Sequence, residues 1–303
     1  MGLLEGLTFL DLSHRLPGPL AGNLLGGLGA RVIKVEDKFY QDPFNDGLFS
    51  KMDDAFKDWY KGLNNKKEIL KLDFSNNEDH RSLKKLVQTS DGIIMGLPPK
   101  VRQKLELSDE DLKELNKPLA VIELKASKSR KNFMHELNAL ALTGLLKLYV
   151  NGRKEDFIRP PFLPFSGIAF GQKVGMDLLA GVLKSKREGK AIFITTYLFE
   201  TAQEVFSPFW PPALQEKKRA KFLHNGLYPC YCIYRTKDGK YVALAAVEKK
   251  FWAQFCEIFD FSMEDRFDTS ENAFKIVSQK LGGYTQKEIK NKIKGHDICL
   301  SLV

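Results

Sequence analysis

Two side chains in this sequence of 303 residues, His135 and Ser166, are candidates for a general base and a nucleophile. His135 opens the run HELNALALTG, and histidine is the residue type whose chemistry most often suits proton transfer near neutral pH. Ser166 lies in the run PFSGI, and a serine hydroxyl attacks only when an adjacent base removes its proton. A single histidine at a helix start is more often a cap or a surface residue, so its type alone leaves the role open.

The four cysteines point to no metal site. Cys230 and Cys232 are two residues apart in an aromatic, strand-like run, and Cys256 and Cys299 stand alone. None of these spacings resembles the paired Cys or His ligands of a zinc site. We therefore expect reduced structural thiols and no bound metal.

Charge does not identify a partner class. Lysine and arginine number 47 against 38 acidic residues, a net charge of +9, but many lysines lie beside acids and form no basic stripe. We therefore expect no nucleic acid partner and no membrane partner. The start lacks a basic region before a long apolar run, and no stretch reaches the length of a membrane span, so we expect a cytoplasmic protein.

The elements that must position these side chains begin with a strand–helix–strand unit. Leu7–Leu12 is predicted to be a buried strand, Leu20–Leu28 a helix that stops at Gly29, and Arg31–Glu36 a second strand. Such units favour a parallel sheet. The pattern recurs further along the chain. Later strands are predicted at 69–74, 92–95, 119–124 and 191–196, and later helices at 78–88, 112–115, 137–148 and 174–183. The segment 39–62 is predicted to be a long surface connection.

This alternation predicts an α/β fold with a Rossmann-like parallel-sheet large domain. The pattern changes near residues 205–225, and Asp238-Gly239 then joins two strand-like runs at 231–235 and 241–247, which is a strong hairpin signal. We therefore predict a large Rossmann-like domain at 1–205, a linker at 206–224 and a smaller α+β domain at 225–303.

The first strand–helix turn does not predict dinucleotide binding. Pro17, Gly18 and Pro19 stand where that motif requires glycines for close backbone approach to a pyrophosphate. Glu36 does end the next strand, roughly where a ribose-binding acid would lie. A partial fingerprint is a weak signal, and the glycines are better explained by turns and packing.

Several short motifs occur in one order along nearly the whole chain and together resemble the family III CoA-transferases and α-methylacyl-CoA racemases. They are LxGLxxLDLS at 4–13, PGP at 17–19, LGAxVIKVE at 28–36, NNKKxxLxLD at 64–73, SDGII at 90–94, GK at 189–190 and YRTKDG at 234–239. The resemblance implies the family III CoA-transferase fold, in which two subunits interlock around shared active sites. It also implies acyl-CoA and carboxylic acid substrates, with coenzyme A or acyl-CoA as the ligand and no covalently bound cofactor.

The resemblance assigns roles to individual residues. His135 matches the histidine that begins a His-Asp-Ile-Asn-like run in the racemases and serves as one base for the α-proton. Glu248 falls where the racemases have a glutamate that orients this histidine, although it also fits an exposed acid in a charged turn. CoA is expected to contact the Pro17-Gly18-Pro19 turn and nearby Arg15, Lys66 and Lys67, because diphosphates favour helix starts and basic neighbours.

The sequence departs from the family at the catalytic aspartate. Counting back from Gly189 without gaps places Ser166 at that position, and a shifted alignment would nominate Asp177 instead. In the transferases this aspartate forms an anhydride with the acyl group, and in the racemases it is the second base. Two loops also differ: 125–130 reads KASKSR instead of Gly-aromatic-Gly, and 96–100 reads GLPPK.

Two hypotheses therefore remain. The first is an acyl-CoA enzyme with reduced machinery, which transfers CoA or epimerises the α-carbon through His135, Glu248 and Ser166 as an interlocked homodimer. The second is a non-catalytic pseudoenzyme, or a subunit that pairs with an intact paralogue in a heteromer.

Overall fold

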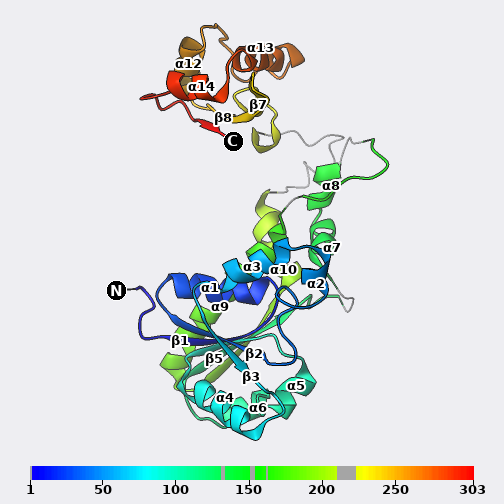
Figure 1. The fold of residues 1–303 in the computed structure, drawn as a ribbon, viewed down its shortest axis with the longest axis vertical. Helices are drawn as coiled ribbons and strands as arrows, with labels where there is room; N and C mark the ends of the chain where they lie inside the picture. Colours follow the sequence, from blue (N-terminus) through cyan, green and yellow to red (C-terminus); the bar gives the residue numbers. More distant parts are fainter. Residues whose placement is uncertain (1, 131–133, 151–153, 162, 210–222) are drawn as a thin grey trace. The chain divides into compact units, whose positions relative to one another are not determined.

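The computed structural model describes residues 2–130, 134–150, 154–161, 163–209 and 223–303, and the chain divides into two compact units. These units are Met1–Glu216 and Lys217–Val303. Most of the linker expected at 206–224 lies outside the described residues. Figure 1 follows the chain through both units.

The first unit is built on a six-stranded parallel sheet in the order β3-β2-β1-β4-β5-β6. Its strands are β1 Thr8–Leu12, β2 Arg31–Asp37, β3 Glu68–Leu72, β4 Gly92–Met95, β5 Leu119–Lys125 and β6 Ala191–Tyr197. This is the strand order of a doubly wound fold, in which ligands bind beyond the carboxyl ends of the strands. The predicted α/β class and parallel sheet are confirmed.

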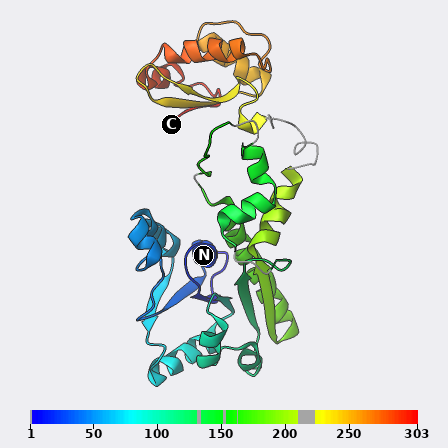
Figure 2. The same cartoon turned by 90° about the vertical axis from the view of Figure 1, so that its right-hand side faces the viewer.

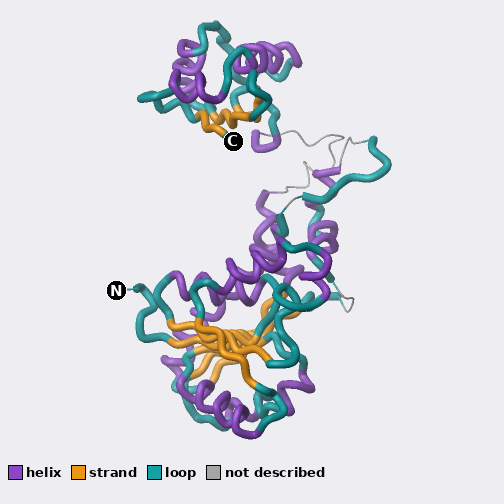
Figure 3. Tube along the Cα trace, in the orientation of Figure 1, coloured by secondary structure: helices purple, strands orange, loops and turns teal. Residues whose placement is uncertain are grey.

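Helices cover both faces of this sheet, as the layers in Figure 3 show. One face carries α4 Asn77–Thr89, α5 Pro99–Lys104 and α6 Asp109–Lys113. The other carries α1 Pro17–Gly27, α3 Ala55–Asn64, α9 Phe165–Glu188 and α10 Leu198–Phe206. On that side α7 Glu136–Leu142 packs against α9 and α10, and α8 Leu145–Val150 follows it (Figure 2).

The four central strands β2, β1, β4 and β5 supply both hydrophobic cores, because neighbouring side chains in a strand point to opposite faces. Leu10 and Ile93 pack into the core under α4 and α6, whereas Phe9 and Ile94 pack into the core under α1 and α9. A sheet buried on both faces explains the nearly continuous apolar runs of these strands.

The segment 39–62 is not the plain connection that we predicted. It forms α2 Leu48–Met52 and α3 Ala55–Asn64. Phe44, Phe49, Phe56 and Trp59 stack on one another with ring centroids between 4.8 and 6.1 Å apart. These aromatic contacts order a segment whose Asp and Gly content suggested a loop.

Three helix predictions also need correction. The helix expected at 174–183 runs from Phe165 to Glu188, because the small residues near its start pack closely against α1. The helix expected at 137–148 is interrupted at Gly144, whose φ of 87° lies in the left-handed region that glycine adopts readily. The helix expected at 112–115 is instead α6, which begins at a Ser108 capping box.

The second unit is a small α+β structure with its own core. β7 Tyr231–Arg235, β8 Tyr241–Ala245 and β9 Leu300–Leu302 form an antiparallel sheet. Three helices pack on this sheet: α12 Lys249–Ile258, α13 Glu271–Gly282 and α14 Gln286–Lys292. The core between them includes Trp252 and Phe255 of α12 and Val277 of α13. The predicted hairpin is confirmed, with Gly239 at a φ of 78° in its turn.

Candidate active site

The starts of α1, α7 and α9 meet in the first unit. A β-carbon added at Gly171 would lie 2.9 Å from the carbonyl oxygen of Pro17, and one at Gly167 would lie 2.8 Å from Leu16. The carboxylate of Glu136, in the first turn of α7, accepts hydrogen bonds from the start of α9. Arg15, His135 and Ser166 therefore belong to three chain segments that come together only in the folded structure.

A cavity of about 620 Å³ lies beside the starts of α1 and α7, a volume typical of small-molecule sites. Arg15 and His135, from distant parts of the sequence, both line it. The remaining lining residues come from the segment 38–49: Lys38, Phe39, Tyr40, Gln41, Pro43, Asp46, Gly47, Leu48 and Phe49. The aromatic side chains of this lining, together with the cationic Arg15 and Lys38, suit a ligand that has an aromatic ring and anionic groups.

Arg15 is held in a strained backbone conformation by Asp42. The φ of Arg15 is 68°, which costs a non-glycine residue about 1–3 kcal/mol. Its N–H donates to both carboxylate oxygens of Asp42, at 3.1 and 3.0 Å. Asp42 also accepts the N–H of Phe44 at 3.0 Å, so one buried carboxylate ties Arg15 to the segment 38–49.

Lys34, a fully buried lysine in β2, neutralises Asp42. Its Nζ lies 3.3 Å from Asp42 Oδ2 and donates to the Ser13 carbonyl at 2.7 Å. Glu36 Oε1 lies 3.7 Å from the same Nζ and accepts the Tyr60 hydroxyl at 3.1 Å. Burial raises the pKa of Glu36, although Lys34 and the Tyr60 hydrogen bond act to lower it. A Glu36 committed to these partners is not placed as a ribose ligand.

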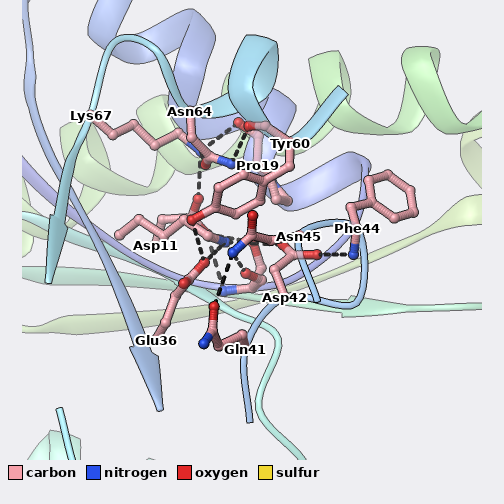
Figure 4. Close-up of polar contacts among 12 residues, drawn as sticks. Asp11, Pro19, Glu36, Gln41, Asp42, Phe44, Asn45, Tyr60, Asn64 and Lys67 are labelled. Atoms are coloured by element: carbon pink, nitrogen blue, oxygen red, sulfur yellow. Dashed lines mark hydrogen bonds and ion pairs between the residues drawn. The ribbon is translucent and has the colours of Figure 1, made fainter. Parts of the chain in front are cut away.

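A second buried pair joins β1 to the residues before β3. Lys67 Nζ bonds to Asp11 Oδ2 at 2.7 Å, to the Pro19 carbonyl at 2.7 Å and to Asn64 Oδ1 at 2.8 Å (Figure 4). Burial raises the pKa of Asp11, but Lys67 and Lys34 outweigh it and lower the pKa to about 2. All three donor positions of Lys67 are therefore directed at protein acceptors.

The expected CoA-binding residues occupy different settings. Pro17 and Gly18 form the first turn of α1, where a β-carbon at position 18 would lie 2.0 Å from Ser13 Oγ. Lys66 is exposed, and its N–H donates to Asn23 at 3.2 Å. Of the five predicted residues, only Arg15 lines the cavity. The roles of Pro17, Gly18, Lys66 and Lys67 in CoA binding stay predictions.

His135 is the N-cap residue of α7 and is exposed. Its neighbour Glu136 accepts the N–H of Ser166 at 2.9 Å and of Gly167 at 2.7 Å. Ser166 is fully buried, and its Oγ has no hydrogen-bond partner among the described residues. The structure thus brings His135 and Ser166 into one neighbourhood through Glu136.

Asp177 lies away from this neighbourhood. It is eleven residues after Ser166 in the same helix, about 16 Å along the axis. Its carboxylate pairs with Lys173 at 2.6 Å and accepts the Thr196 hydroxyl at 2.9 Å. These contacts tie α9 to β6, and the Asp177 carboxylate does not take part in the site at the start of α9.

Glu248 lies in the second unit, where it is the exposed N-cap residue of α12 and makes no side-chain cap hydrogen bond. Its proposed partnership with His135 stays a prediction.

The carboxylate of Glu200 accepts hydrogen bonds from the loop that follows β5. Glu200 Oε1 accepts the Ser127 and Ser129 hydroxyls and the N–H groups of Lys128 and Ser129, all at 2.9–3.0 Å. This loop stands where the family resemblance expects Gly-aromatic-Gly, and its donors are satisfied internally.

Sequence reasoning missed Asp42, Lys34, Tyr60 and Glu136. A lysine inside the apolar run RVIKVE was the available signal for the Lys34 network, because a buried lysine requires an acidic partner. Glu136 was visible only as the neighbour of His135. Among the described residues, no group of three or more His, Cys, Asp or Glu side chains is placed to hold a metal ion.

Comparison with known proteins agrees with this architecture. Residues 4–303 match the family model for CoA-transferase family III. The chain is 25% identical over 318 residues to the CaiB/baiF CoA-transferase family protein ZK892.4 of Caenorhabditis elegans, covering 99% of this chain and 85% of the relative. It is 27% identical over 260 residues to human alpha-methylacyl-CoA racemase, covering 82% of this chain and 63% of that protein.

A crystal structure of a CAIB/BAIF family protein from Brucella suis has a TM-score of 0.76 at 19% identity, covering 100% of this chain and 84% of the other. This likeness concerns the fold. The doubly wound sheet of the first unit is thus the fold that proteins of the CAIB/BAIF family share. The chain belongs to CoA-transferase family III. None of the described helices is both long and apolar enough to cross a membrane.

The Asp42–Lys34 pair yields a stability prediction. Asp42→Ala is expected to lower the free energy of unfolding by about 3–5 kcal/mol, because it leaves Lys34 buried with less compensation and removes the hydrogen bonds that hold Arg15. Asp46→Ala, an exposed acid of the same segment, is the control and should stay within about 0.5 kcal/mol. Urea denaturation followed by circular dichroism measures both. Equal losses in the two variants would contradict the structural role of Asp42.

Proposed function

We propose that this protein binds acyl-CoA thioesters in the cavity beside the starts of α1 and α7, and that His135 exchanges the proton on their α-carbon. The observation that carries the proposal is that Arg15 and His135 line one cavity of about 620 Å³. Membership of CoA-transferase family III supports the ligand class. Human alpha-methylacyl-CoA racemase and human Succinyl-CoA:glutarate CoA-transferase, 27% and 24% identical, carry both chemistries in their names.

The chemistry favours α-proton exchange over CoA transfer by the family aspartate. Position 166 is a serine, which cannot form the aspartyl anhydride of the transferases. A thioester acidifies its α-proton, and an imidazole that ionises near neutral pH can remove and return it. The α-carbon must lie near His135 at the cavity wall, with the anionic end of the CoA group toward Arg15.

The central experiment incubates the protein with a panel of acyl-CoAs in deuterated water. Mass spectrometry reads both deuterium at the α-carbon and transfer of CoA to added carboxylic acids. His135→Ala is expected to lower α-exchange by about 10²–10⁴-fold, because it removes the base. His296→Ala, an exposed histidine of the second unit, is the matched control and should leave the rate unchanged.

An acyl-CoA that binds without any exchange or transfer would refute the enzymatic proposal. That outcome is the one expected of the second hypothesis, a non-catalytic subunit pairing with an intact paralogue.

Arg15 is expected to contact the anionic groups of CoA. Arg15→Met keeps the side-chain length but removes the charge, so the affinity measured by calorimetry should fall about tenfold, equivalent to about 1.4 kcal/mol. Arg81→Met, an exposed arginine on α4 at the other face of the sheet, is the control. Loss of affinity should shrink at high salt, because screening weakens the charge contact. Equal affinities for wild type and Arg15→Met would exclude this contact.

A homodimer with interlocked subunits is part of the proposal. Phe39, Tyr40, Leu48 and Met52 are 67–80% exposed beside the cavity, an apolar area of the kind that protein partners cover. Sedimentation velocity at micromolar concentration should give the mass of two chains. A single monomeric species throughout that range would rule out the dimer.

A further inference from the structure

A carboxylate lies at the start of α9 although position 166 is a serine, and it belongs to Glu136. Its Oε1 accepts the Ser166 N–H at 2.9 Å, and its Oε2 accepts the Gly167 N–H at 2.7 Å. Two backbone donors hold the group in a defined orientation, because the helix fixes the direction of both N–H bonds. The sequence analysis had considered only Ser166 and Asp177 for the position of the family aspartate.

The Glu136 carboxylate keeps free acceptor sites on both of its oxygens. Each of its oxygens accepts one of the two bonds and retains a further acceptor site. Among the described residues, no Lys or Arg lies within ion-pair distance of it. The group is half-buried and directly follows His135, which lines the cavity.

Ser166 does not have the surroundings of an activated nucleophile. Its Oγ is buried and no described residue accepts its proton or donates to it. A serine without an adjacent base is a weak nucleophile and no base at all. The chemistry that the family assigns to position 166 therefore has to come from a neighbouring side chain.

We propose that Glu136 is the second base of the acyl-CoA site, working with His135 to invert the α-carbon of 2-methylacyl-CoA thioesters. This inference rests on the proposed function. One of the two groups takes the α-proton, the C–H bond breaks, and the electron pair moves onto the thioester carbonyl oxygen as an enolate. The other group, as imidazolium or carboxylic acid, gives a proton to the opposite face of the α-carbon. The carbonyl re-forms, and no oxidant or further reactant is required.

The test follows a single enantiomer of a 2-methylacyl-CoA in deuterated water, measuring α-deuterium and inversion separately. Wild type is expected to do both. Glu136→Gln should lose inversion by about 10²–10⁴-fold, while exchange through His135 and the affinity for the acyl-CoA persist. Gln keeps the size of the side chain, and its thermal unfolding midpoint shows whether the start of α9 is still held.

A second variant distinguishes the two possible roles of Glu136, a catalytic base or a cap of α9. Glu136→Gln combined with Ser166→Asp returns a carboxylate to the same helix start from the neighbouring residue, and it should regain at least tenfold of the lost inversion. If the double variant stays as slow as Glu136→Gln, Glu136 acts as a cap and the inference is wrong. Unchanged inversion in Glu136→Gln also overturns it.

Exchange and inversion measured with the wild type alone test the role of Glu136 even if the variants fail to fold. Exchange without inversion would refute Glu136 as a second base and leave the proposed function standing. Binding without any exchange would instead refute the proposed function itself.

Discussion

The fully buried pair of Lys34 and Asp42 is the contact on which the candidate site depends. A buried lysine is tolerated only when an acidic partner and further acceptors compensate its charge. Asp42 and the Ser13 carbonyl provide them, and Asp42 in turn holds the strained backbone of Arg15. The charge of one strand residue thus determines how the segment 38–49 folds over the sheet, and with it the wall of the cavity.

The starts of three helices carry the remaining parts of the site. Close packing at Gly167 and Gly171 brings α1 against α9, and Glu136 ties α7 to the same place. Helix starts present unpaired N–H groups, which explains why an acid of the protein itself is held there. Position 166 of this member of CoA-transferase family III is a serine, and the carboxylate held at the start of α9 belongs to Glu136.

The regular elements were largely predictable because local patterns define them. Buried strands have continuous apolar runs, and β4 was predicted at 92–95, the bounds that it has in the structure. The long helix α9 and the pair α2 and α3 were not predicted correctly, because their order comes from contacts with distant segments rather than from apolar periodicity. Of the candidate site, His135, Ser166 and Arg15 could be nominated one by one, but their grouping could not.

The sequence by itself determined the fold class, the family and the absence of an aspartate at position 166, because all three depend on residue types in linear order. Only the tertiary structure decided that Arg15 and His135 line one cavity, that Asp177 is committed to Lys173 and Thr196, and that Glu136 reaches the start of α9. Such outcomes depend on side chains up to 120 residues apart, whose distances are set by how the helices pack on the sheet and not by spacing along the chain.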